Sequence, residues 1–107
     1  MFDTKNIGIG AGVHAIRAAE LIASGSSFNA IAKVLANEVK NSKIFFSVAT
    51  LEYLQKGGRI GLVSSIVGNM LNLNPIISCN DDGIYYTVAK SRGRKKSLEK
   101  AVKLVKA

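Results

Sequence analysis

The 107-residue sequence predicts an α/β fold in its first half that passes into a two-layer α+β unit in its second half. Two observations lead to this prediction. Before Thr50, apolar residues at helical spacing alternate with strand-forming residues; after it, two strand patterns joined by a tight turn precede an amphipathic helix. The predicted order is β-α-α-β-α-α-β-β-α. The change of pattern near Thr50 is the one candidate domain boundary, between residues 1–50 and residues 51–107.

The first half is predicted to contain a strand end, two helices and a buried strand. Met1–Thr4 has the composition of a strand end, and Val13–Ile22 that of a helix, which Ser24-Gly25-Ser26 ends. Ser27 is a suitable N-cap for the next helix. Lys43–Ala49 (KIFFSVA) is short, apolar and rich in β-formers, which predicts a buried strand. The second helix is indicated by apolar residues at helical spacing: Phe28, Ile31, Leu35 and Val39.

The segment Thr50–Gly61 (TLEYLQKGGRIG) is the most informative part of the chain. Its threonine can cap a short helix by accepting a hydrogen bond from a backbone N–H two or three residues on. Within that helix, Glu52 and Lys56 are spaced to form an exposed ion pair. The double glycine at 57–58 ends the helix. Arg59 is thereby held between glycines, which indicates that it is aimed at a ligand or a partner.

The remaining elements are predicted to be a helix, a hairpin and a last helix. Val63–Leu71 has a helical pattern. Ile76–Asn80 and Ile84–Lys90 are predicted strands, joined by Asp81-Asp82-Gly83, a strong hairpin turn. A helix is predicted from about Arg94 to Lys106. Its inner face is expected to carry four apolar residues: Leu98, Ala101, Val102 and Val105.

The composition restricts the class of protein. With 48% hydrophobic residues and one proline, the chain can bury a core. The single cysteine, Cys79, excludes an internal disulfide and a cysteine-based metal cluster, and the single histidine, His14, cannot form a metal site alone. These features fit a reducing cytoplasm. The sequence has neither the ~20-residue apolar run that spans a bilayer nor a signal peptide.

No group of residues indicates catalysis. Gly8, Gly10 and Gly12 do not complete the dinucleotide-binding pattern, because its third glycine would have to stand where Val13 does. They are interpreted as a strand-to-helix turn. Cys79 is interpreted as a small buried hydrophobe, and one histidine allows no credible Ser-His-Asp arrangement. The sequence therefore predicts a binding protein without a cofactor rather than an enzyme.

Positive charge is concentrated in the second half. The net charge is +8, and Lys90–Lys96 (KSRGRKK) places five basic residues at a predicted strand-to-helix junction. This cluster is either a solvated surface or a site for an anionic partner, and the helix dipole does not favour basic residues at a helix start. The main alternative function is a nucleic-acid-binding module, because phosphate contacts would use the same cluster. Tyr85 and Tyr86 lie on the adjacent predicted strand.

Three segments together resemble the DegV family of bacterial lipid-binding proteins. They are Asp3-Thr4 before a glycine-containing turn, Thr50–Gly61, and Lys90–Ser97 (KSRGRKKS); the connection Leu71–Ile77 (LNLNPII) is also similar. The resemblance implies a two-domain α/β fold that binds one long-chain fatty acid in a tunnel between the domains. It also implies that the protein presents the acyl chain to an ATP-dependent fatty-acid kinase, which phosphorylates the carboxylate. No nucleic-acid partner is expected on this interpretation.

The resemblance implies an electrostatic role for four basic residues. Arg59 and Arg92 would lie near the mouth of the pocket, close to the carboxylate or acyl-phosphate, or against an acidic face of the kinase. Arg94 and Lys95 would belong to the same patch. The binding protein would be a carrier with no chemistry of its own.

Other positions are expected to contact the ligand on the same basis. Ile60 and Gly61 would line the pocket, with the glycine allowing close approach of the ligand. Met70 and Leu71 would contact the acyl tail. Thr4 stands where the family usually has serine, so its hydroxyl is expected to keep the family role.

The chain departs from the family in one large respect. It lacks the family's first half, which carries the Thr and Ser side chains that hold the carboxylate, and a C-terminal portion is expected to be missing as well. We therefore interpret it as a fragment that spans the join between the two domains. The fragment is expected not to enclose a fatty acid tightly by itself. Surfaces that would otherwise be core are expected to drive self-association.

Overall fold

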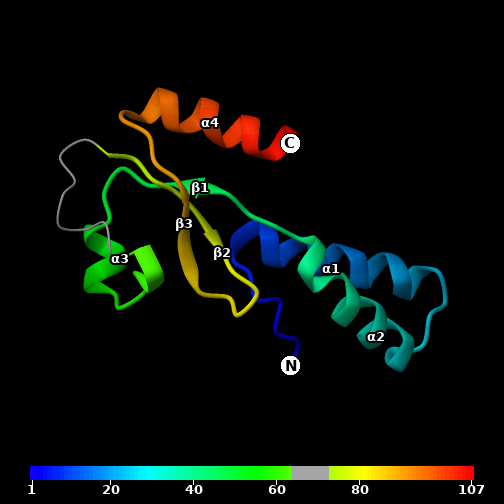
Figure 1. Ribbon diagram of the computed structural model, residues 1–107. Coiled ribbons are helices and arrows are strands. Elements are labelled where there is room, and N and C mark those ends of the chain that lie inside the picture. The colour runs from blue at the N-terminus through cyan, green and yellow to red at the C-terminus, as the bar shows by residue number, and fades with distance from the viewer. Residues whose placement is uncertain (64–72) are drawn as a thin grey trace.

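The structure is a computed structural model that describes residues 1–63 and 73–107 (Figure 1). It combines helices with a small antiparallel sheet, as the sequence predicts. Figure 1 shows α1 (Gly8–Ala23) beside α2 (Phe28–Glu38) at one end of the molecule, and the sheet with α3 (Glu52–Lys56) and α4 (Arg94–Lys106) toward the other. Most of the helix predicted over Val63–Leu71 lies outside the described residues. The elements are α1 (Gly8–Ala23), α2 (Phe28–Glu38), the 3₁₀ turn η1 (Val39–Asn41), β1 (Phe46–Ser47), α3 (Glu52–Lys56), β2 (Ile76–Cys79), β3 (Tyr85–Ala89) and α4 (Arg94–Lys106).

Helix α1 begins at Gly8, five residues before the predicted start at Val13. The side chain of Asn6 lies against the first turn of this helix. Its Oδ1 accepts a hydrogen bond from the backbone N–H of Ile7 at 3.0 Å, and it lies against Gly10, where a Cβ would collide with it. The interpretation of these glycines as a turn before the helix is therefore wrong, because they form its first turns.

Helix α2 begins where the sequence predicts. Ser27 Oγ accepts a hydrogen bond from the backbone N–H of Ala30 at 3.2 Å, which confirms the predicted N-cap. The two helices pack side by side and are linked by an ion pair between Arg17 Nε and Glu38 Oε2 at 3.2 Å. Because both side chains are partly exposed to solvent, this pair adds little to the stability of the helix packing.

Two strand predictions in the first half need correction. Met1–Thr4 is not a strand, because none of the described strands lies beside it and a strand needs a hydrogen-bonded neighbour. The strand predicted over Lys43–Ala49 shortens to β1, because only Phe46 and Ser47 pair with β2. Both residues of β1 are half-buried rather than buried.

The predicted hairpin is confirmed as β2 and β3. The strands are antiparallel, with Cys79 opposite Tyr85. At the turn, Asn80 Oδ1 accepts hydrogen bonds from the backbone N–H groups of Asp82 and Ile84, each at 3.0 Å. The strand order is β1-β2-β3, so the sheet joins chain from both sides of residue 50. The domain boundary near that residue stays a prediction.

The sheet has one face toward α3 and the other toward α4. Consecutive strand residues point to opposite faces. Phe46 packs toward α3, whereas Ser47 meets α4, where its Oγ lies 2.9 Å from Ser97 Oγ. The core on the α3 side consists of three buried residues and five half-buried ones: Leu51, Val63 and Ile77, with Phe46, Val48, Leu54, Ile60 and Tyr85.

Helix α4 has the predicted bounds but not the predicted inner face. Leu98, Val102 and Val105 are 48%, 52% and 69% exposed, so their assignment to the core is wrong within the described chain. Ser97 is buried instead and Ala101 is half-buried. The reason is that α4 packs on the two-residue strand β1, which is too short to cover a wide apolar face.

Candidate functional site

The turn after α3 fixes where Arg59 leaves the helix. The N–H of Gly58 donates to the carbonyl of Gln55 at 3.1 Å, and the N–H of Arg59 donates to the carbonyl of Leu54 at 2.8 Å. Gly58 has a φ of +69°, a conformation that side chains disfavour. These two bonds and the left-handed glycine form a Schellman motif, which confirms the predicted double-glycine stop.

Gly61 holds the same loop against the sheet. Its φ is +56°, and a Cβ at this position would lie 2.8 Å from the carbonyl oxygen and 3.1 Å from the nitrogen of Tyr85. A side chain here would collide with backbone that cannot move aside without disturbing β3. In this structure, the close approach that Gly61 allows is to the first residue of β3.

A cavity of about 310 Å³ lies beside this contact. The Arg59 side chain is exposed, and its Nη1 donates to the carbonyl of Gly57 at 3.2 Å. No carboxylate of residues 1–63 and 73–107 forms an ion pair with it. The guanidinium is therefore available to an anion from outside. The cavity is lined by Ile7, Gly58, Arg59, Gly61, Gly83, Ile84 and Tyr85.

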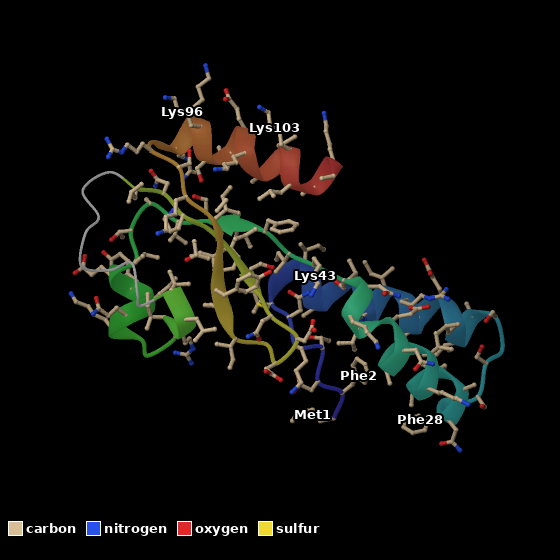
Figure 2. All side chains as sticks on the ribbon, viewed as in Figure 1. Met1, Phe2, Phe28, Lys43, Lys96 and Lys103 are labelled. Carbon is tan, nitrogen blue, oxygen red and sulfur yellow. The ribbon has the colours of Figure 1, made fainter. Side chains whose placement is uncertain are left out.

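The basic segment, residues 90–96, is held by the chain just before β2. Leu73 and Arg92 form an isolated antiparallel bridge, and the N–H of Asn74 donates to the carbonyl of Ser91 at 2.7 Å. Arg92, Arg94 and Lys96 are exposed to solvent. Figure 2 shows Lys96 and, further along α4, Lys103 extending away from the sheet.

A buried polar junction anchors this segment to the sheet. Ser97 is fully buried, and its Oγ lies 2.9 Å from Ser47 Oγ and 3.1 Å from the carbonyl oxygen of Asn74. The Asn74 side chain donates in turn to the carbonyl of Val48 at 3.1 Å. These bonds tie the start of α4 to β1 and to the chain entering β2.

The structure does not bring the predicted arginines to one point. Arg59 lies beside Tyr85, the first residue of β3, whereas Arg92 follows Ala89, its last residue. The five extended residues of β3 span about 17 Å. Arg94 and Lys95 lie in the first turn of α4 and therefore group with Arg92. Two separate basic sites result.

The other predicted site residues divide into three groups. Gly61 lines the cavity with Arg59, whereas Ile60 packs against the core on the α3 side. Thr4 lies elsewhere, at a small cavity of about 40 Å³ lined in part by Cys79, and its Oγ1 donates to the carbonyl of Asn6 at 3.4 Å. Met70 and Leu71 lie outside the described residues.

Sequence reasoning missed an apolar cavity of about 610 Å³ between α1, α2 and the N-terminal segment. Met1, Phe2 and Phe28, labelled in Figure 2, line it, and Phe28 is 84% exposed. The apolar spacing of α2 was visible in the sequence, but not which of these side chains would stay uncovered. Sequence reasoning also missed Tyr85 as a neighbour of Arg59, for which no local pattern exists.

A family model described as an uncharacterised protein of the DegV family matches residues 1–107. The chain belongs to the DegV family. A DegV domain-containing protein of Clostridium perfringens is 45% identical over 105 residues, which cover 98% of this chain and 37% of that protein. One from Clostridium acetobutylicum is 40% identical over 106 residues, covering 99% and 38%. The chain thus spans less than two fifths of the length of these DegV relatives.

Solved DegV structures have the same fold. A fatty-acid-binding DegV protein of Thermus thermophilus superposes with a TM-score of 0.87 at 35% identity, over 98% of this chain and 37% of that one. DegV of Bacillus subtilis, described as a fatty-acid-binding protein, gives a TM-score of 0.81 at 32% identity, over 97% and 37%. The recognition of the family from the sequence is therefore confirmed.

The described residues form neither a metal cluster nor a membrane-spanning helix. Within residues 1–63 and 73–107, no three His, Cys, Asp or Glu side chains gather as a metal site would require. The helices in the same part of the chain are all too short or too polar to cross a membrane.

Proposed function

We propose that this chain forms part of a carrier that binds one long-chain fatty acid and presents its carboxylate to an ATP-dependent fatty-acid kinase. The observation that carries this proposal is similarity along almost the whole chain to a solved DegV protein described as fatty-acid-binding, at 35% identity. The exposed guanidinium of Arg59, which lies beside a cavity without a carboxylate partner among the described residues, supplies a cation for the acid head group.

In this proposal the carrier performs no chemistry. The kinase transfers the phosphoryl group from ATP, and the carrier supplies position and charge. Arg92, Arg94 and Lys95 would form the surface that meets the kinase, because they are exposed and grouped at the start of α4. The expected ligand contacts of Thr4, Ile60, Gly61, Met70 and Leu71 and the cytoplasmic location remain part of the same proposal.

Lipid extraction tests the proposal most directly. The natural gene product is purified without detergent, extracted with organic solvent and analysed by mass spectrometry. We expect about one long-chain fatty acid per molecule, and acyl-phosphate after addition of ATP and the kinase from the same bacterium. A protein that carries no fatty acid and takes up none when the acid is supplied would contradict the proposal.

The 107-residue chain alone gives a second test. This chain spans less than two fifths of the length of its DegV relatives, so we expect it to bind a fatty acid only weakly by itself. Native mass spectrometry that finds one C16–C18 acid retained per chain would show this expectation to be wrong. This is about the usual length of a long acyl chain, in which each buried CH₂ group contributes ~0.8 kcal/mol to binding.

Self-association of this chain is expected from its uncovered apolar residues. Ile22, Phe28 and Val105 are 65%, 84% and 69% exposed. Large apolar patches on a surface favour association. Analytical ultracentrifugation should show dimers or larger species at high concentration, and a clean monomer would count against this expectation.

A nucleic-acid-binding module is the alternative, favoured by the exposed basic segment. Binding of labelled DNA and RNA is measured at low and physiological salt. We expect only weak binding that disappears as the salt rises, since it would rest on phosphate contacts alone. Sequence-specific binding that survives physiological salt would favour the alternative.

A further inference from the structure

The hairpin turn, Asp81-Asp82-Gly83, contacts the N-terminal segment of the chain. A Cβ on Gly83 would lie 3.3 Å from the Cα of Lys5, so the two backbones meet closely. Beside this contact, Lys43 Nζ donates to Asp81 Oδ1 at 3.1 Å. Figure 1 shows the same juxtaposition, with the turn between β2 and β3 next to the N-terminal chain. The turn therefore joins parts of the molecule that are far apart in sequence.

The turn and its partners belong to different ends of the molecule. The helical end, residues 1–43, contains α1 and α2, which pack on each other. The sheet end, residues 46–63 and 73–107, contains the strands with α3 and α4. Ile44 and Phe45 connect the two ends and form neither helix nor strand. A short irregular connection can absorb changes in φ and ψ, as hinges do.

The N-terminal segment is shaped for this contact by a strained residue. Lys5 has a φ of +53°, a left-handed conformation that residues with side chains disfavour. Its backbone N–H donates to Asp3 Oδ1 at 2.9 Å, and its Nζ lies 2.8 Å from Asp3 Oδ2. The bond to Asp3 and, more weakly, the charge of Asp82 raise the pKa of Lys5. Such strain persists only where the surroundings hold it, and here they include the turn.

The contact also forms one side of the cavity beside Arg59. The lining of this 310 Å³ cavity includes Ile7 from the helical end and Gly83 from the turn. Because both ends form its wall, separating the turn from the N-terminal segment would widen the cavity. The ion pair that holds them is exposed, with 85% of the Asp81 side chain and 43% of the Lys43 side chain accessible. Exposed pairs are weak, so this contact can open reversibly.

We propose that the hairpin turn is a latch between the two ends of the chain. In the closed state, Asp81 pairs with Lys43, Gly83 lies against Lys5, and the cavity is narrow. In the open state, the two ends turn about residues 44–45 and the cavity widens. The inference rests on the proposed function only for what would enter the cavity, because the movement itself needs no ligand.

Single-molecule fluorescence energy transfer on the 107-residue chain measures this movement. The method works without ligand and at concentrations too low for copies to associate. The dyes are attached through Ser24→Cys and Gln55→Cys, at exposed residues of the helical end and the sheet end. Cys79→Ala removes the native thiol in every sample.

Three variants separate the latch from net charge. Lys43→Glu places a negative charge opposite Asp81. Lys43→Glu with Asp81→Lys restores the pair with its charges exchanged. Lys33→Glu is the matched control, because it makes the same change of net charge at another exposed lysine of the helical end. Circular dichroism checks that each variant keeps the secondary structure of the wild type.

We expect one main transfer efficiency in the wild type. Lys43→Glu should raise the ratio of open to closed chains on the order of tenfold, because an attraction is replaced by a repulsion. The exchanged pair should restore the distribution of the wild type, and Lys33→Glu should leave it unchanged. In about 1 M salt the wild type should shift toward the open state, since the Debye length falls to ~3 Å.

The latch would be overturned by an unchanged distribution in Lys43→Glu, by an exchanged pair that does not restore it, or by an equal change in Lys33→Glu. If Lys43→Glu does not fold, the wild type in salt decides, and the absence of a shift there overturns the inference. The proposed function fails separately. If the natural gene product yields and takes up no acid, the carrier proposal falls, whereas these ligand-free measurements still decide the latch.

Discussion

The two basic sites of this chain are built in opposite ways. The loop of Arg59 is fixed by backbone contacts: a Schellman motif on one side and the approach of Gly61 to Tyr85 on the other. The basic segment at residues 90–96 places its charges on exposed side chains, and only its backbone and Ser97 are held. The first site presents one exposed cation beside a cavity, which suits a small anion. The second presents several exposed cations close together, which suits a broad acidic surface.

The largest expected effect is on the fixed loop. Gly61→Ala should lower the free energy of unfolding by about 2–4 kcal/mol, because it adds left-handed strain to a collision with the backbone of Tyr85. Gly58→Ala is the matched control: its φ is also positive, but a Cβ there would meet nothing within 4 Å. Urea unfolding should give a loss of only about 1–2 kcal/mol for Gly58→Ala. Equal losses in the two variants would mean that the contact between Gly61 and Tyr85 does not hold the loop.

An intermediate effect is expected at the junction that anchors the basic segment. Ser97→Ala removes a fully buried hydroxyl and leaves Ser47 Oγ and the Asn74 carbonyl without this partner. We expect a loss of about 1–2 kcal/mol in the free energy of unfolding. Ser24→Ala, at an exposed serine, should change it by less than about 0.5 kcal/mol. No loss in Ser97→Ala would mean that the backbone alone holds the segment.

The exposed charges should matter for association and little for folding. Arg94→Glu with Lys95→Glu should change the free energy of unfolding by less than about 0.5 kcal/mol. Under the proposed function, the affinity of the natural gene product for a fatty-acid kinase, measured by surface plasmon resonance, should fall on the order of tenfold and depend less on salt. Lys33→Glu with Lys40→Glu changes the net charge equally and is the control. If both double variants lose affinity alike, net charge rather than this segment is responsible.

The smallest effect concerns pH and comes from Cys79, the strand partner of Tyr85. Burial raises the pKa of the Cys79 thiol above its ordinary value of 9.0. The folded chain therefore holds this proton more tightly than the unfolded chain does, so stability is full below pH 9.0 and falls as the pH rises through the raised pKa. Urea unfolding at neutral and alkaline pH should show this decline, and Cys79→Ala should reduce it. If the loss of stability at alkaline pH is unchanged in Cys79→Ala, titratable groups other than this thiol cause it.

Short-range signals predicted much of this structure. Ser27, the double glycine at 57–58 and the hairpin turn act on backbone within a few residues, and all three are found where the sequence places them. Thr50 Oγ1 likewise accepts a hydrogen bond from the N–H of Glu52, at 3.2 Å. The early start of α1 was missed because glycine is a poor helix former, so Gly8, Gly10 and Gly12 were interpreted as a turn.

Contacts between residues far apart in the chain could not be predicted from the sequence. The inner face of α4 depends on how much sheet it meets, and β1 has only two residues. The pairing of Arg59 with Tyr85 depends on Gly61 meeting a strand that lies more than twenty residues further along the chain. The expectation that Arg59 and Arg92 act together came from the family resemblance, and the sequence alone does not reveal that β3 separates them.

The pairing of β1 bears on the order of events during synthesis. In the described sheet, Phe46 pairs with Ile77, which lies thirty-one residues later in the chain. The hydroxyl of Ser47 bonds with that of Ser97, which lies fifty residues later. Helices α1 and α2 are consecutive in the chain and pack against each other, so they can do so as soon as they leave the ribosome. Phe46 must therefore remain unpaired until Ile77 has been made, and the apolar stretch 43–49 around it is where a nascent chain would need protection by a chaperone.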